Sequence, residues 1–308
     1  LARDLRRRGL VVAMSGGVDS SVAAGVAVAA VGPKRVLGLF LPERDSDARS
    51  LELATEWAGK LGIEHITEDI APALGAVGCY ERRDEAIRSV VPEYGEGWKS
   101  KIVLPGDRLN SDRLNTFSVV VESPEGERTS HRLPPAELRT LVAATNFKQR
   151  VRKMFEYYHA DRLHYAVAGT PNRLEYDQGF FVKGGDGLAD TKPLAHLYKT
   201  QVYALAEELG VPETVIRRPP TTDTYSLPQS QEEFYFALPA RTMDLVLYAR
   251  NEGLGAEEAA EALGLEPGQV ERAFRDIDQK RSTTRYLHLP PLLAGPVPEI
   301  RARGGGEA

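Results

Sequence analysis

The sequence predicts an α/β protein built on a doubly wound parallel sheet, with helices on both faces. Apolar runs, which are candidate strands, alternate along the chain with stretches of helical apolar spacing. This alternation is typical of a parallel sheet. The continuous run at 35–41 also favours a strand covered on both faces. The expected strands are residues 11–13, 35–41, 63–70 and 163–168, and the first two helices are 21–31 and 48–61.

The middle of the chain changes character. Residues 84–94 predict a helix, whereas 101–104, 116–122 and 127–133 are strand-like, with a Ser-Pro-Glu-Gly turn at 123–126. We expect a β-hairpin inserted at about 100–134. Further helices are expected at 135–158, 194–209, 241–251, 256–263 and 267–280. The prediction is a single domain over residues 1–289, followed by a flexible tail at 290–308 that is rich in Pro, Gly and Arg.

The composition and charge of the chain argue against several classes of protein. A net charge of −5 gives no electrostatic footprint for a nucleic-acid partner. Runs of about 18 apolar residues, which a membrane span needs, do not occur. The single cysteine, Cys79, excludes an internal disulfide and fits a reducing compartment. We therefore expect a cytoplasmic protein that binds neither nucleic acid nor membrane.

The stretch after the first strand, Met-Ser-Gly-Gly-Val-Asp-Ser-Ser at 14–21, predicts an anion-binding loop. Gly16 and Gly17 allow the backbone to approach a ligand, and the following helix start supplies N–H donors. Asp19 would repel a phosphate unless a cation lies between them, so this pattern indicates a metal–polyphosphate complex. The alternative is an ordinary strand–turn–helix corner.

A second group of polar residues follows the strand at 163–168. Glu175 lies shortly after that strand and is a candidate second metal ligand. The segment 179–190 carries four glycines in nine positions, which suits a loop that wraps a ligand. In that loop Lys183 is a point charge for phosphate, and Asp186 and Asp190 are polar anchors. The alternative is a solvated surface loop.

These motifs carry a resemblance. Residues 15–20 resemble the PP-loop, SGGxDS, of the ATP pyrophosphatases. Together with Asn-Phe-Lys-Gln-Arg-Val-Arg at 146–152, the segment 169–202, Pro-Thr-Thr-Asp at 220–223 and Lys-Arg at 280–281, they resemble the NAD synthetase family of ammonia-dependent type. The resemblance spans most of residues 11–281, apart from about 96–134. It implies an adenine nucleotide alpha-hydrolase-like fold.

The resemblance also implies a reaction. The nicotinate carboxylate of deamido-NAD would attack the α-phosphate of ATP and release pyrophosphate; ammonia would then displace AMP and give NAD. The co-substrate would be ATP, with Mg²⁺ as the metal. Since the chain given carries no glutamine amidohydrolase portion, we expect free ammonia or a separate glutaminase as nitrogen source, and by family analogy a homodimer.

Carried over by motif, the site falls into four groups. Catalytic roles are implied for Asp19, Lys183 and Asp186. ATP binding is implied for Ser15, Gly16, Gly17, Val18, Asp19, Ser20, Ser21, Thr170, Lys183 and Thr221. Substrate binding is implied for Lys148, Arg150, Asp186 and Asp190, and metal binding for Asp19 and Glu175.

The sequence departs from the family pattern on the acceptor side. The hairpin is extra, residues 225–238 lack an acidic, aspartate-rich stretch, and the C-terminal motif reads Thr-Arg-Tyr-Leu-His at 284–288. Two alternatives therefore stand beside the NAD synthetase: a paralogous ATP-dependent amide ligase acting on a different carboxylate, and a nucleotide-binding regulator without activity.

Overall fold

A computed structural model describes residues 1–104, 117–219, 224–229, 235–236 and 238–297. Its centre is a parallel sheet in the order β3-β2-β1-β7, so β1 pairs with both β2 and β7. The four strands are β1 (Leu10–Ala13), β2 (Val36–Phe40), β3 (Glu64–Thr67) and β7 (Ala166–Ala168). All five residues of β2 are buried, as a strand covered on both faces requires.

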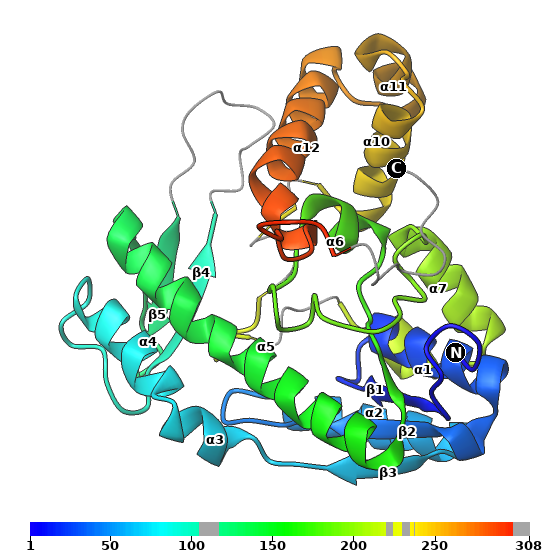
Figure 1. The fold of residues 1–308 in the computed structure, drawn as a ribbon. Coiled ribbons are helices and arrows are strands. Elements are labelled where there is room, and N and C mark those ends of the chain that lie inside the picture. The colour runs from blue at the N-terminus through cyan, green and yellow to red at the C-terminus, as the bar shows by residue number, and fades with distance from the viewer. Residues whose placement is uncertain (105–116, 220–223, 230–234, 237, 298–308) are drawn as a thin grey trace.

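The winding reverses at β1. From β1 the chain steps to β2 and β3 in one direction, and then returns past β1 to β7 on its other side. Right-handed crossovers therefore place the first helices on one face and the returning helix on the other. The first face carries α1 (Val18–Val31), α2 (Ala48–Leu61) and α7 (Lys199–Glu208), and the second carries α3 (Ala71–Ala76) and α5 (Pro135–Leu163). Figure 1 shows α5 running across the second face.

The core follows the alternation of β1. Leu10 and Val12 pack with α1, α2 and α7, whereas Val11 between them packs with α3 and α5. Successive side chains of a strand point to opposite faces, so one four-residue strand serves two cores. The predicted doubly wound sheet with helices on both faces is confirmed.

The predicted hairpin is also confirmed, as a separate antiparallel sheet in the order β4-β5-β6. Its strands are β4 (Lys99–Val103), β5 (Ser118–Glu122) and β6 (Arg128–Arg132). It lies beside α4 (Cys79–Arg88) and the beginning of α5 (Figure 1). Most of the tail, residues 298–308, is outside the described residues.

A third layer packs above the strand ends, around α6 (Arg173–Gln178), α10 (Ala240–Asn251) and α12 (Pro267–His288), with α11 (Ala256–Leu263) beside them. The short elements are η1 (Pro33–Arg35) and α8 (Glu213–Ile216). Within the described part of the chain, no helix has the length and apolar character to cross a membrane.

Several predicted boundaries are wrong. α5 continues to Leu163, five residues beyond the predicted end at 158. It is capped there by His164, whose backbone has the left-handed conformation. α12 continues to His288 since nothing breaks the helix before Pro290, and α7 begins only at Lys199, after a turn. The predicted helix at 84–94 is α4, which begins earlier, at Cys79, and ends at Arg88. The short helices α3, α6 and α8 were not predicted, because single turns carry little periodicity.

The two glycines after β1 have different roles. Gly16 has φ +74°, and a Cβ there would lie 2.3 Å from the backbone oxygen of Ser50. Gly17 has φ −90°, and a Cβ there would meet only Ser15 Oγ, at 3.5 Å. Protein packing therefore requires glycine at position 16 but leaves room at position 17.

We predict that Gly16→Ala lowers the free energy of unfolding by about 1–3 kcal/mol, through backbone strain and the contact with Ser50. Gly17→Ala is the matched control and should retain wild-type stability. Urea denaturation of the two variants measures both values. Equal stabilities of the two variants would contradict the assignment.

Candidate functional site

A cavity of about 590 Å³ lies at the carboxyl ends of β1, β2 and β7. This is the switch point of the sheet, where ligands of open α/β folds bind. The largest contributions to its lining come from the loops after β1 and β2, the segment after β7, the inner face of α5 and the loop that follows α6. The segments at 218–219 and 224–225 and the end of α12 also line it. The predicted loops at 14–21 and 179–190 therefore meet at one cavity.

Internal hydrogen bonds hold the loop after β1. The N–H of Ser15 donates to Ser20 Oγ at 3.2 Å, and that hydroxyl donates to the carbonyl of Gly17 at 3.0 Å. Gly17 caps α1 without a side-chain acceptor, so the first-turn N–H groups of α1 can bind an anion. Of the predicted residues in this stretch, five line the cavity: Ser15, Gly17, Val18, Asp19 and Ser20.

Gly16 and Ser21, also predicted to bind ATP, are not among the lining residues. Gly16 packs against Ser50, as described above. Ser21 is 1% exposed, and its carbonyl accepts a hydrogen bond of 2.9 Å from Trp57 Nε1. The structure thus places these two residues in the support of the loop.

Asp19 is the centre of a polar group contributed by three elements. Its Oδ1 accepts a hydrogen bond of 2.9 Å from Asn172 Nδ2, and its Oδ2 forms an ion pair with Lys199. Asn172 caps α6 and, through its N–H, donates to Glu175 Oε2 at 3.1 Å. Asp19, Glu175 and Lys199 all line the cavity. The two predicted metal ligands therefore lie together at one end of it.

Two residues of this group, Asn172 and Lys199, were not predicted from the sequence, and Lys199 is the charged one. Burial alone would lower its pKa, but Asp19 and Glu175 outweigh burial and raise the pKa above the ordinary value. A lysine at the first position of a helix is unfavourable to the helix dipole. A lysine at the first position of a helix needs a carboxylate partner from another element, so this position in the sequence could have indicated an ion pair.

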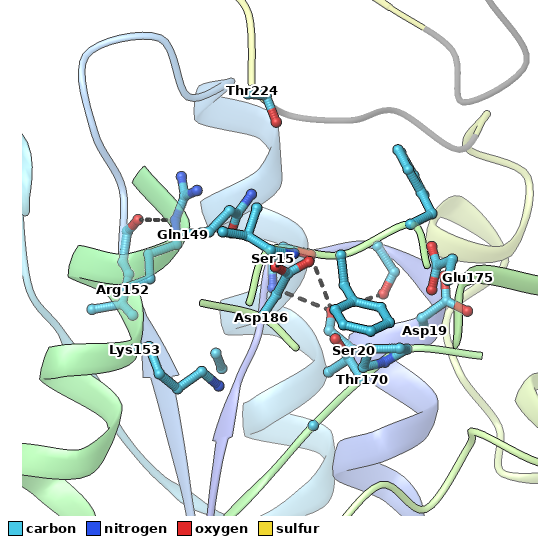
Figure 2. Close-up of a pocket in the computed structure, with 18 of the residues that line it drawn as sticks. Ser15, Asp19, Ser20, Gln149, Arg152, Lys153, Thr170, Glu175, Asp186 and Thr224 are labelled. Carbon is cyan, nitrogen blue, oxygen red and sulfur yellow. Dashed lines mark hydrogen bonds between the residues drawn. The ribbon is translucent and has the colours of Figure 1, made fainter. Parts of the chain in front are cut away.

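Thr170, predicted to lie near adenosine, lines the cavity between its two ends (Figure 2). Thr221, the other threonine predicted to bind ATP, lies outside the described residues.

The loop after α6 places its three predicted residues differently. Lys183 lines the cavity, and its amine donates to the carbonyls of Tyr286, at 2.6 Å, and Leu289, at 3.1 Å, at the end of α12. Asp186 also lines the cavity, and burial raises the pKa of its carboxyl. Asp190 is not a lining residue; its Oδ2 accepts the N–H of Val167 at 2.8 Å and so fastens the loop to β7.

The inner face of α5 provides cationic side chains. Arg150 and Arg152 both line the cavity, but Nε of Arg150 donates to the carbonyl of Lys183, at 3.3 Å, and Nε of Arg152 to that of Leu41, at 3.4 Å. Their two-residue spacing directs them to different points. Lys153 and Glu156, which the motifs did not indicate, line the cavity one turn further along.

Lys148, predicted to bind substrate, is fully buried and is not a lining residue. Its amine donates to Glu43 Oε1 at 2.8 Å, Asp45 Oδ2 at 2.6 Å and the carbonyl of Thr224 at 2.8 Å. Three acceptors use all three N–H donors of a lysine. The amine therefore ties α5 to the loop after β2 and to the segment at Thr224, which itself lines the cavity.

Arg83 completes this buried network, with Nη1 2.6 Å from Asp45 Oδ2. Burial alone would raise the pKa of Asp45, but the positive charges of Lys148 and Arg83 outweigh it and hold the pKa below the ordinary value. Each carboxylate of the network therefore faces a cation, Glu43 at Lys148 and Asp45 at both Lys148 and Arg83.

We predict that Lys148→Met lowers the free energy of unfolding by about 3–5 kcal/mol, since Glu43 would remain buried without its cation and Asp45 would keep Arg83 but lose Lys148. The matched control is Lys60→Met, which removes the exposed pair of Lys60 with Glu56 and should change stability by no more than about 0.5 kcal/mol. Urea denaturation measures both. Equal losses would refute the role of Lys148.

The chain matches the family model described as NAD synthase over residues 3–91 and 121–287. The NH(3)-dependent NAD(+) synthetase of Rhizobium meliloti (strain 1021) is 60% identical over 298 residues, covering 97% of this chain and 89% of the relative. That of Thermotoga maritima is 35% identical over 284 residues, covering 92% of each.

Solved structures share the fold. An NMN synthetase from Francisella tularensis superposes with a TM-score of 0.62 at 24% identity, covering 93% of this chain and 89% of that one. An NH3-dependent NAD synthetase from Campylobacter jejuni, in complex with the nitrate ion, gives 0.60 at 20% identity, with 96% and 93% covered. At these identities the likeness shows the fold alone. The family model and the two sequence relatives confirm the predicted resemblance: the chain belongs to the NAD synthase family, whose members are ligases that form a carbon–nitrogen bond with ATP.

Proposed function

We propose that this protein is an ammonia-dependent NAD synthetase. It would adenylate the nicotinate carboxylate of deamido-NAD with ATP and then amidate it with ammonia, giving NAD, AMP and pyrophosphate. The observation that supports the proposal is one cavity that has the glycine loop after β1 and two carboxylates at one end and α5 cations at the other. The 60% identity to a relative of that name supports the choice of substrates.

In the first step a carboxylate oxygen attacks the α-phosphorus, and the bond to the bridging oxygen of pyrophosphate breaks. The chain's contribution is to position the reactants and to neutralise charge. Ser15 and the first-turn N–H groups of α1 would donate to the β- and γ-phosphates, with Lys199 beside them. Ser20 would do so by exchanging its hydrogen bond to the Gly17 carbonyl. Lys183 would reach ATP phosphates by exchanging its two backbone acceptors at the end of α12, and Thr170 would lie at the adenosine.

Asp19 and Glu175 are proposed to hold Mg²⁺. The donor set fits, since Mg²⁺ is usually bound through one or two carboxylates together with phosphate oxygens and water. Among the described residues no group of three or more His, Cys, Asp or Glu could hold a metal. When bound, the ion would neutralise negative charge on the β- and γ-phosphates.

In the second step the nitrogen of ammonia attacks the acyl carbon, and the bond to the AMP oxygen breaks. The nitrogen then loses a proton to give the amide. Asp186 is proposed to face ammonia, because it is a carboxylate that lines the cavity; burial raises the pKa of that carboxyl. Arg150 would serve the dinucleotide, whereas Lys148 and Asp190 would act through the segments that they hold.

A homodimer in the cytoplasm, using free ammonia or a separate glutaminase, is part of the same proposal. Met154 and Tyr158 lie one turn apart on α5 and are 69% and 62% exposed. Such an exposed apolar pair on a helix suits an interface between copies. Cys79, as the single cysteine, is compatible with a reducing compartment.

The function is tested by measuring AMP formation from ATP with ammonium and either deamido-NAD or nicotinate mononucleotide. We expect turnover with deamido-NAD at a kcat/KM at least about tenfold higher. A folded, ATP-binding protein that turns over neither compound would refute the proposal. In that case a ligase for another carboxylate, or a regulator without activity, would account for the fold.

We predict that Asp19→Asn abolishes pyrophosphate release, because the substitution removes the negative charge that would bind the metal and that pairs with Lys199. The variant also leaves Lys199 less compensated, so its stability should fall. Asp19→Asn/Lys199→Met removes both charges and should recover stability without recovering pyrophosphate release. Calorimetry and a coupled pyrophosphate assay measure the two properties. Normal release by Asp19→Asn would rule out its metal role.

A further inference from the structure

A second buried ion pair faces the cavity from α5. Lys153 Nζ lies 2.6 Å from Glu156 Oε2, and each side chain is 5% exposed. The two residues are three apart on the helix, and both line the cavity. Neither has a role in the site described so far. A buried pair rarely adds stability over apolar residues of similar size, so its position in the cavity calls for another reason.

The pair lies at the end of the cavity opposite the predicted metal ligands. In Figure 2, Lys153 and Arg152 are on one side of the view, Asp19 and Glu175 on the other, and Ser20 and Thr170 between them. This agrees with the fold, because α5 covers one face of the sheet and α1 and α7 the other. The cavity therefore has a phosphate end and an α5 end.

The chemistry assigns a reactant to the α5 end, if the proposed function is correct. In a displacement at phosphorus the attacking and leaving oxygens lie roughly in line. Pyrophosphate would leave toward Asp19 and Lys199. The carboxylate that attacks must then arrive from the opposite side, where Lys153 lies.

Charge and donor count favour an anion at Lys153. Three cations and two carboxylates interact there: Lys153, Arg152 and Lys192 against Glu156 and Asp186. One further carboxylate would balance the group. The Lys153 amine has three N–H donors, and Glu156 is the one hydrogen-bond partner that it has in the described part of the chain.

We propose that Lys153 binds the carboxylate of the acceptor, with Glu156 holding the amine in place. One carboxylate oxygen would accept a hydrogen bond from Lys153, while the other attacks the α-phosphorus. The inference rests on the proposed function and adds the residue that recognises the reacting group.

The test uses two ligands that differ only at that group. Deamido-NAD carries a carboxylate where NAD carries a carboxamide. The ratio of their dissociation constants therefore measures the interaction of Lys153 with the carboxylate. We expect Lys153→Met to weaken deamido-NAD by about 10- to 100-fold, the value of a hydrogen bond to a charged group. NAD should change by less than about twofold. Equal weakening of both ligands, or no change, would overturn the proposal.

Lys153→Met leaves Glu156 buried without its cation and could unfold the protein. Lys153→Met/Glu156→Leu removes both charges and keeps the volume, so this double variant replaces the single variant in the binding measurement if the latter is unfolded. Removal of the negative charge of Glu156 would by itself strengthen binding of an anion. If the double variant no longer prefers deamido-NAD over NAD, the missing interaction is therefore that of Lys153. Retained preference would overturn the proposal. Lys60→Met, the exposed-pair control, should keep the wild-type ratio.

The proposed function is measured separately, by wild-type exchange of pyrophosphate into ATP. Exchange that depends on deamido-NAD supports the function whatever the binding ratio of Lys153→Met. Absence of exchange from the wild type would refute the function and, with it, this inference.

Discussion

The reversal of winding at β1 is the constraint on which the rest of the structure depends. β1 pairs with β2 on one side and β7 on the other, so α1, α2 and α7 lie on one face of the sheet and α5, which leads back to β7, lies on the other. The cavity lies at the carboxyl ends of these strands, between the helices of the two faces. Its two ends differ in chemistry because they are lined by helices from opposite faces of the sheet.

Three buried lysines near the cavity are each compensated by a carboxylate from another part of the chain or from the next turn of the same helix. Lys199 faces Asp19, Lys148 faces Glu43 and Asp45, and Lys153 faces Glu156. Burying an ion costs several kcal/mol that its partner only partly returns. Buried ion pairs of this kind occur at three places around one cavity. That concentration distinguishes the cavity from the apolar cores on either face of the sheet.

Local signals predicted the elements that local physics determines. The strand, loop and helix at 11–31 follow from an apolar run, two glycines and a stretch of small residues, and the structure confirms them. The partner of Asp19 could not be predicted in this way, because Lys199 is 180 positions away in sequence. Motif resemblance likewise indicated Lys148 as a ligand contact. Its burial depends on where the loop after β2 goes, and no pattern around residue 148 encodes that path.

The Lys148 amine also couples the evolution of segments that are far apart in the sequence. One ammonium group bonds Glu43, Asp45 and the backbone at Thr224, so none of these segments can change its charge or its path alone. A neutral residue at position 148 requires a neutral residue at 43 or 45, and an insertion near 224 would remove an acceptor. Among related proteins, positions 43, 45 and 148 should therefore be exchanged as a set. The residues that support the wall of the cavity should therefore evolve together, although they are far apart in the chain.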